Sequence, residues 1–186
     1  SSEMFGKSKP PQNEKTLFQP RSVYAISKVF AYHSVIHYRE AYNLHACNGI
    51  LFNHESPRRG VNFVTKKIIQ GLTRIKNGKQ KILILGNLYS RRDWGHAKDY
   101  VESMWRILQQ KKPDDFVVAT RTSHSVKDFI NISAKKIGIK LIWKNKGLKE
   151  VGIDKTNNIN TIDDRTCCRA RLCVCERMPT RLPHDS

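Results

Sequence analysis

Short apolar runs alternate with longer segments of helical period along most of this chain. The apolar runs are residues 46–52 (ACNGILF), 81–87 (KILILGN), 116–120 (FVVAT) and 139–143 (IKLIW), and each reads as a buried strand. Strands that alternate with helices are typical of α/β folds, because a helix carries the chain from one parallel strand to the next. The alternation therefore predicts an α/β layer architecture in which at least part of the sheet is parallel.

Four segments have the period of an amphipathic helix. Ser125 and Asp128 have the spacing of an N-terminal capping box, and Gly138 is a residue typical of a helix stop. Residues 53–60 (NHESPRRG) are rich in turn-forming and charged residues and predict a loop, and residues 91–100 read as a turn followed by a helix start. The predicted helices are 24–43, 62–75, 96–110 and 125–138.

The length of 186 residues suits one domain with a sizeable core. Helical and strand periods end near Asp163, so we expect the folded domain to span residues 1–163 and the Arg- and Cys-rich tail, 164–186, to be disordered. The tail could suggest zinc, but its C-C-x4-C-x-C spacing lacks separated C-x2-C pairs, and we predict no metal. The candidate ligands there are Cys167, Cys168, Cys173, Cys175 and His184.

The formal net charge is +18, which would suit a nucleic acid, an anionic membrane surface or a phosphorylated substrate. Residues 65–81 hold six basic residues and no acidic one. The chain lacks interleaved stacking aromatics and finger-type zinc ligands, which disfavours nucleic-acid binding. No apolar run reaches membrane-spanning length and residues 1–20 lack a signal-peptide core, so we expect no membrane association and a cytosolic location.

Tyr24 precedes Lys28 by four residues at the start of a predicted helix, so the two side chains share a helix face. A phenol normally loses its proton near pH 10, but a neighbouring ammonium favours the phenolate. The pair is therefore a candidate base. The spacing alone equally allows a half-buried tyrosine beside a solvated lysine.

Several longer motifs resemble a known family. SSEMFGK (1–7), YAISK (24–28) and LFNHESPRRG (51–60) resemble the extended short-chain dehydrogenases/reductases. YREAYNL, NGILFNHESPRRG, NFVTKKI and RRDWGHAKDYVE are similar to the GDP-mannose 4,6-dehydratase family, and the resemblance runs from Ser1 to about Asp163. It implies a partial NAD(P)-binding Rossmann-type doubly wound sheet. The chain has no G-x-G-x-x-G turn, so the first βαβ units are expected to be missing.

The resemblance implies four catalytic residues. Tyr24 would take the proton of the sugar 4-hydroxyl while hydride leaves carbon 4 for NADP+, and Lys28 would bind the nicotinamide ribose and stabilise the phenolate. Ser1 would hydrogen-bond the 4-oxygen, and Glu3 would remove the carbon-5 proton before water leaves carbon 6. Without the resemblance, Glu3 would be read as a solvated carboxylate in a polar stretch.

Further residues match binding positions of the family. His54 and Arg59, with Tyr24 and Lys28, would contact NADP, while Asn53, Lys67 and Arg92 would contact the substrate. Two adjacent arginines could bind phosphate on their own account, but a lone histidine in a loop is more often a structural hydrogen-bonding residue. For Lys67 and Arg92 the alternative is an ordinary basic surface.

The resemblance implies an NADP-dependent hydro-lyase that converts GDP-mannose to GDP-4-keto-6-deoxymannose and water, towards GDP-fucose. The family forms dimers or tetramers, so a homo-oligomer is expected for the whole protein. Without the first βαβ units, we expect the isolated chain to expose a sheet edge and to be inactive. The alternative is a non-enzymatic basic remnant of the fold that binds polyanions or subunits of the intact enzyme.

Overall fold

The computed structural model of the chain describes residues 1–147, 150–155 and 159–163. The contacts divide it into two compact units. Unit 1 comprises Ser1–Lys67 and Arg91–Ser125, and unit 2 comprises Ile68–Ser90 and the chain from Val126 onward. The predicted tail, with its candidate zinc ligands, lies outside the described residues, so the boundary at Asp163 stays a prediction.

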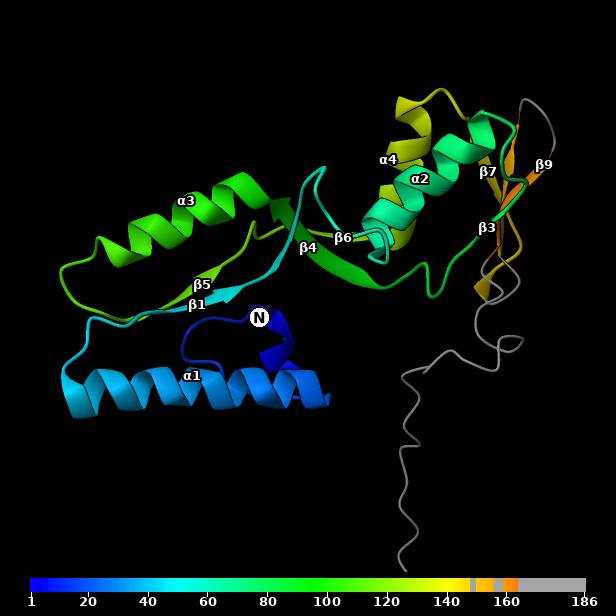
Figure 1. The fold of residues 1–186 in the computed structure, drawn as a ribbon. Coiled ribbons are helices and arrows are strands. Elements are labelled where there is room, and N and C mark those ends of the chain that lie inside the picture. The colour runs from blue at the N-terminus through cyan, green and yellow to red at the C-terminus, as the bar shows by residue number, and fades with distance from the viewer. Residues whose placement is uncertain (148–149, 156–158, 164–186) are drawn as a thin grey trace, which may run out of the picture. The chain divides into compact units, whose positions relative to one another are not determined.

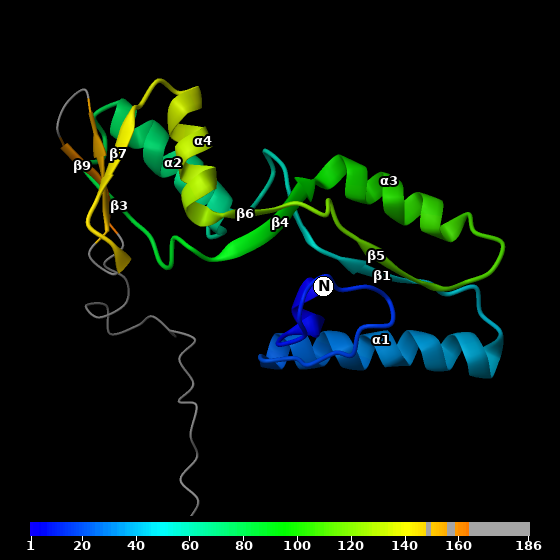
Figure 2. The same cartoon turned by 180° about the vertical axis from the view of Figure 1, so that it is seen from behind.

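Unit 1 contains a parallel strand pair with a helix on each face. Strands β1 (Asn48–Leu51) and β5 (Asp115–Val118) pair in parallel, with Asn48 opposite Asp115. Helices α1 (Val23–Tyr42) and α3 (Ala97–Leu108) lie on opposite faces of this pair (Figures 1 and 2). The other elements of unit 1 are the 3-10 helix η1 (Ser2–Phe5) and strands β2 (Asn53–Glu55), β4 (Arg91–His96) and β6 (Ser123–Ser125), with β4 parallel to β2 and antiparallel to β6.

Helix α1 begins and ends at residues suited to those positions. Ser22 has extended backbone angles and its hydroxyl accepts the Ala25 N–H, which satisfies one of the free donors of the first turn. The helix ends at Asn43, whose φ of 50° is a left-handed conformation that asparagine tolerates well. The predicted helix, 24–43, is thus shifted by one residue.

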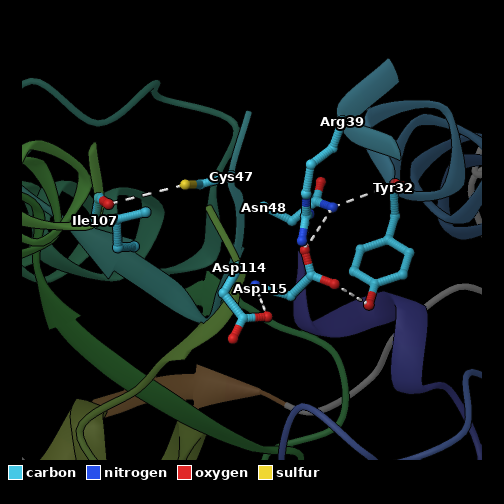
Figure 3. Close-up of polar contacts among 7 residues, drawn as sticks. All are labelled: Tyr32, Arg39, Cys47, Asn48, Ile107, Asp114 and Asp115. Carbon is cyan, nitrogen blue, oxygen red and sulfur yellow. Dashed lines mark hydrogen bonds and ion pairs between the residues drawn. The ribbon is translucent and has the colours of Figure 1, made fainter. Parts of the chain in front are cut away.

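Helix α1 is hydrogen-bonded to the strand pair through Asn48 Nδ2 of β1, which donates to the Tyr32 carbonyl oxygen at 3.2 Å, and through the Asp115 carboxylate of β5 (Figure 3). This carboxylate accepts hydrogen bonds from the Tyr32 hydroxyl (2.6 Å), from Asn48 Nδ2 (2.9 Å) and from the Arg39 guanidinium (2.5 Å). These side chains are largely buried, so the charge-assisted bonds replace the water that burial removes.

The outer edge of β5 is capped by side chains. The backbone groups of β5 that face β1 form the ladder between the two strands; for example, Phe52 N–H donates to the Val118 carbonyl oxygen. Because backbone groups alternate in direction along a strand, the Asp115 and Val117 N–H groups face away from β1. The Asp115 N–H donates to Asp114 Oδ1, and the Val117 N–H donates to Glu14 Oε1, each over 2.8 Å. Both outward donors of this strand therefore bind carboxylates.

Unit 2 is a four-stranded mixed sheet in the order β3-β9-β8-β7, with helices beside it (Figure 1). Strand β3 runs parallel to β9, and the other pairs are antiparallel. Gly71 in α2 faces the Leu83 side chain of β3, where an added Cβ would lie 2.7 Å from a Leu83 methyl carbon. The elements are α2 (Val64–Lys76, whose first four residues belong to unit 1), β3 (Leu83–Ile84), α4 (Val126–Lys136), β7 (Leu141–Lys144), β8 (Val151–Asp154) and β9 (Ile159–Asp163).

The predicted α/β architecture with parallel pairing is confirmed, but two predicted loops are wrong. Asn53–Glu55, expected in a loop, forms β2, and Arg91–His96 forms β4, although residues 92–95 are expected as a turn and His96 as the start of a helix. These polar segments become strands because they pair with each other, an interaction that local propensity does not record. Within the described ranges no helix is long and apolar enough to cross a membrane.

Candidate functional site

Unit 1 contains a pocket of about 710 Å³ formed by η1, α1, β1, β2 and the segment after β2. It brings together seven of the nine site residues expected from the sequence, which are otherwise up to 58 positions apart in the numbering. These seven are Ser1, Glu3, Tyr24, Lys28, Asn53, His54 and Arg59.

The 3-10 helix η1 places Ser1 and Glu3 on the pocket wall. The Ser1 hydroxyl accepts the Glu3 N–H at 3.4 Å and caps this short helix. Met4 and Phe5, the last two residues of η1, are buried and anchor it, while Glu3 stays exposed. A hydroxyl and a carboxylate are thus available to a ligand in the pocket.

Tyr24 and Lys28 lie one turn apart at the start of α1. The Lys28 ammonium lies 5.5 Å from the centroid of the Tyr24 ring, and the tyrosine is 53% exposed. The ammonium and the ring are thus in cation–π contact, and both side chains line the pocket.

His54 is held by its own strand and by a neighbouring ring. Its Nδ1 lies 2.9 Å from the carbonyl oxygen of Phe52, and its ring stacks on Tyr100 with a centroid distance of 4.7 Å. A carbonyl oxygen can only accept a hydrogen bond, so Nδ1 carries the proton and Nε2 is left for a ligand.

Arg59 is held in place by an acidic and an aromatic side chain. Its Nε lies 3.2 Å from Glu55 Oε2, and its guanidinium carbon lies 3.5 Å from the centroid of Phe63. The Thr65 hydroxyl donates to the same Glu55 oxygen at 2.8 Å, which fixes the carboxylate. A guanidinium held in this way suits the planar oxygens of a phosphate or carboxylate.

Lys67 and Arg92 are not among the residues that line this pocket. Lys67 is exposed on α2, and Arg92 is exposed on β4, where its guanidinium donates to the carbonyl oxygen of Arg91 at 2.8 Å. The structure therefore does not bring these two sequence candidates together with the other seven.

The pocket presents groups suited to an anionic ligand. It presents two cations, Lys28 and Arg59, and a histidine with one ring nitrogen free for a ligand. The buried Arg59 Nε has no hydrogen-bond partner of good geometry in the described part of the chain. Over the same ranges, no group of three or more histidine, cysteine or acidic residues could hold a metal ion.

Phe63 and Tyr100 are site residues that the sequence did not single out. Phe63 lines the pocket four residues after Arg59, in a non-helical segment that precedes α2, so no helical spacing indicates the contact. Tyr100 lies 46 positions from His54 in the numbering, and no local pattern joins them.

Residues 1–172 match the model of the family described as GDP-mannose 4,6 dehydratase. The chain is 59% identical over 155 residues to GDP-mannose 4,6 dehydratase 1 of Arabidopsis thaliana, and 52% identical over 160 residues to GDP-mannose 4,6 dehydratase of Drosophila melanogaster. The matches cover 83% and 86% of this chain but 41% and 40% of those proteins. The chain thus spans about 40% of the length of the relatives it matches.

Solved structures share the fold. RMD from Pseudomonas aeruginosa, complexed with NADPH, is similar with a TM-score of 0.68 at 22% identity, over 73% of this chain and 48% of that one. dTDP-glucose 4,6-dehydratase from Bacillus anthracis, in complex with NAD, has a TM-score of 0.65 at 20% identity, over 74% and 44%. The predicted fold class, a partial Rossmann-type sheet of the extended short-chain dehydrogenase/reductase kind, is confirmed.

Proposed function

Because the chain belongs to the GDP-mannose 4,6-dehydratase family, we propose that it supplies the catalytic side chains of a cytosolic enzyme that converts GDP-mannose to GDP-4-keto-6-deoxymannose and water, a step towards GDP-fucose. The observation that carries this proposal is the single pocket in unit 1 lined by Ser1, Glu3, Tyr24 and Lys28. The whole protein would be a hydro-lyase and a homo-oligomer, and the isolated chain would be inactive.

Tyr24 would be the base for the sugar 4-hydroxyl. Its exposed phenol can reach a ligand in the pocket, and the Lys28 ammonium lies 5.5 Å from the centroid of its ring. Ser1 would hydrogen-bond the 4-oxygen and orient it towards the tyrosine. Carbon 4 stays a ketone in the product, so the hydride taken from carbon 4 would be delivered to carbon 6. Of the two protons taken up by Tyr24 and Glu3, one would leave with the carbon-6 hydroxyl as water and the other would return to carbon 5.

Glu3 would take the proton from carbon 5. That proton becomes acidic once carbon 4 is a ketone, because the carbanion is conjugated with the carbonyl. The carboxylate is exposed on η1, and the Ser1 cap fixes the turn that carries it. Loss of this proton and of the carbon-6 hydroxyl removes one water, which accounts for the mass lost by the sugar.

NADP is the cofactor that the proposal requires. When bound, it would supply reversible hydride transfer. Lys28 would hold the nicotinamide ribose together with Tyr24, and His54 and Arg59 would bind its polar and anionic groups. The fixed Arg59 guanidinium and the proton on His54 Nδ1 support this assignment.

Asn53 would contact the substrate from the same pocket, since it precedes His54 on β2. Lys67 and Arg92 remain proposed contacts of the GDP diphosphate. Both are exposed and cationic, as a phosphate contact requires, but they lie outside the pocket that the described residues form.

A second candidate function rests on the net charge of +18. A basic surface of this size could retain polyanions or subunits of an intact dehydratase without catalysis. Retention on DNA that falls steeply with salt would support this alternative, because each released counterion contributes to the slope.

The proposal can be tested in a chimera that joins residues 1–163 to the preceding part of the Arabidopsis relative. With NADP+ and GDP-mannose it should yield the 4-keto product, and Tyr24→Phe should abolish turnover. Tyr38→Phe is the matched control, because Tyr38 lies on the same helix with almost the same exposure, 52% against 53%, and does not line the pocket. Unchanged turnover in Tyr24→Phe would contradict the role of Tyr24.

A further inference from the structure

We propose that Tyr100 is a positioning residue, whose ring holds His54 in the tautomer that presents an unprotonated Nε2 to the cofactor. The inference rests on the proposed cofactor role of His54. Tyr100 does not line the pocket, so it would act through His54 rather than on the ligand. Its contribution would come from the ring and not from the hydroxyl.

The first observation is the register of β2 and β4. His54 lies opposite Gly95 in this parallel pair. A Cβ added to Gly95 would lie 2.3 Å from Cε2 of Tyr100 and 3.1 Å from a Thr120 methyl carbon. The Tyr100 ring therefore fills the space next to Gly95 that a side chain would occupy, and only a glycine at this position leaves room for the ring.

The second observation is the stacking itself. The rings of His54 and Tyr100 have centroids 4.7 Å apart and an interplanar angle of 29°. Tyr100 is 3% exposed and lies in α3, one turn after the cap residue His96, whose side chain accepts the Lys98 N–H at 3.2 Å. A buried ring on a capped helix has little freedom to move, so its stacking contact restricts rotation of the imidazole.

The third observation connects the stack to a protonation state. The His54 ring is oriented with Nδ1 2.9 Å from the Phe52 carbonyl oxygen, which requires a proton on Nδ1. If the ring could rotate away from this carbonyl, either nitrogen could carry the proton. By restricting this rotation, the Tyr100 ring preserves His54 Nε2 as an acceptor for an amide or hydroxyl donor of the ligand.

The Tyr100 hydroxyl has no part in this role. In the described ranges it is buried without a hydrogen-bond partner. Burial and the nearby charge of Asp93 raise the pKa of Tyr100 to about 12, so the group stays neutral. Removing it should remove an unsatisfied polar atom and leave the stack intact.

The test compares Tyr100→Phe, Tyr100→Leu and Gly95→Ala, with Val101→Ala as the control. Val101 follows Tyr100 in α3 and is 63% exposed, so its change should alter neither fold nor site. Nitrogen-15 NMR of labelled histidines in the 186-residue chain reports which ring nitrogen of His54 is protonated. We expect Nδ1–H in the unchanged chain, Tyr100→Phe and Val101→Ala, and a mixture of tautomers in Tyr100→Leu and Gly95→Ala.

A second readout is NADP+ binding by the chimera that carries these residues. Tyr100→Leu should weaken the Kd about tenfold, because a displaced imidazole misplaces the acceptor, while Tyr100→Phe stays within about twofold. An unchanged tautomer and Kd in Tyr100→Leu, or a loss of both in Tyr100→Phe, would overturn the proposal. Failure of the dehydratase proposal would instead appear as NADP+ binding without turnover in the unchanged chimera, which leaves the tautomer measurement valid.

Discussion

The carboxylate of Asp115 in β5 lies 2.6 Å from the hydroxyl of Tyr32 in α1, although the two residues are 83 positions apart. The same carboxylate binds Arg39 and Asn48, so one side chain links the helix that carries Tyr24 and Lys28 to the strand pair. The position of α1 therefore depends on a charge on a neighbouring strand.

Asp115→Asn should lower the free energy of unfolding by about 3 kcal/mol, because it leaves the largely buried Arg39 guanidinium without its charge partner. Urea denaturation followed by circular dichroism measures this change. Asp114→Asn is the matched control, since its exposed side chain keeps an oxygen that can accept the Asp115 N–H. Equal stability of the two variants would show that the cluster adds nothing to unit 1.

Glu150 in unit 2 predicts a dependence of stability on pH. Burial alone would raise its pKa, but hydrogen bonds from Lys127 (2.6 Å) and Tyr89 (2.7 Å) outweigh burial and lower the pKa below the ordinary 4.5. A carboxylate whose folded-state pKa is depressed stabilises the fold above its unfolded pKa, and this stability is lost as the pH falls through the folded value.

Glu150→Gln should remove that part of the pH dependence. Between about pH 6 and about pH 3, the unchanged chain should lose more stability than the variant, and the difference isolates Glu150 from the other carboxylates. Urea midpoints recorded across this range supply the measurement. Parallel curves for the two proteins would rule out a contribution from Glu150.

Phe63→Leu should weaken NADP+ binding about fivefold in the chimera, because it removes the ring that lies 3.5 Å from the Arg59 guanidinium carbon. The change should raise KM for the cofactor and leave kcat nearly constant, since the acid-base residues are untouched. Val61→Ala, on an exposed neighbour, serves as control. A fall in kcat at constant KM would contradict a role confined to binding.

Gly6→Ala should destabilise unit 1, because the glycine has a φ of 50° and an added Cβ would lie 1.8 Å from the Gln19 carbonyl oxygen. Gly78→Ala measures the cost of backbone strain without a steric clash, because Gly78 has a φ of 68° but a Cβ added there would have no atom within 4 Å. We expect about 1 kcal/mol from backbone strain at Gly78 and a larger loss at Gly6. Thermal unfolding compares the two, and similar losses would show that the Gln19 contact is irrelevant.

The regular elements that the sequence predicted are those with a strong local period. The helices 24–43 and 125–138 match α1 and α4 to within two residues at each end, and Gly138 has the positive φ expected of a helix stop. Strands β2 and β4 could not be predicted, because they are short and polar and are defined by pairing with each other.

The candidate site shows the same division. The motifs identified the seven residues that the pocket brings together, whereas Lys67 and Arg92, which the resemblance also proposed, lie outside it. The supports behind the site, such as Tyr100 behind His54, come from distant segments. No local pattern of charge or hydrophobicity specifies which buried ring will lie behind which imidazole.

The two carboxylates on the outer edge of β5 disfavour the addition of a further strand at that edge. Both outward amides of β5 already donate to Asp114 and Glu14, so a foreign strand arriving there would find no free donors and would meet two negative charges. Glu14 thus protects this sheet edge by occupying an N–H group with which a further strand would pair.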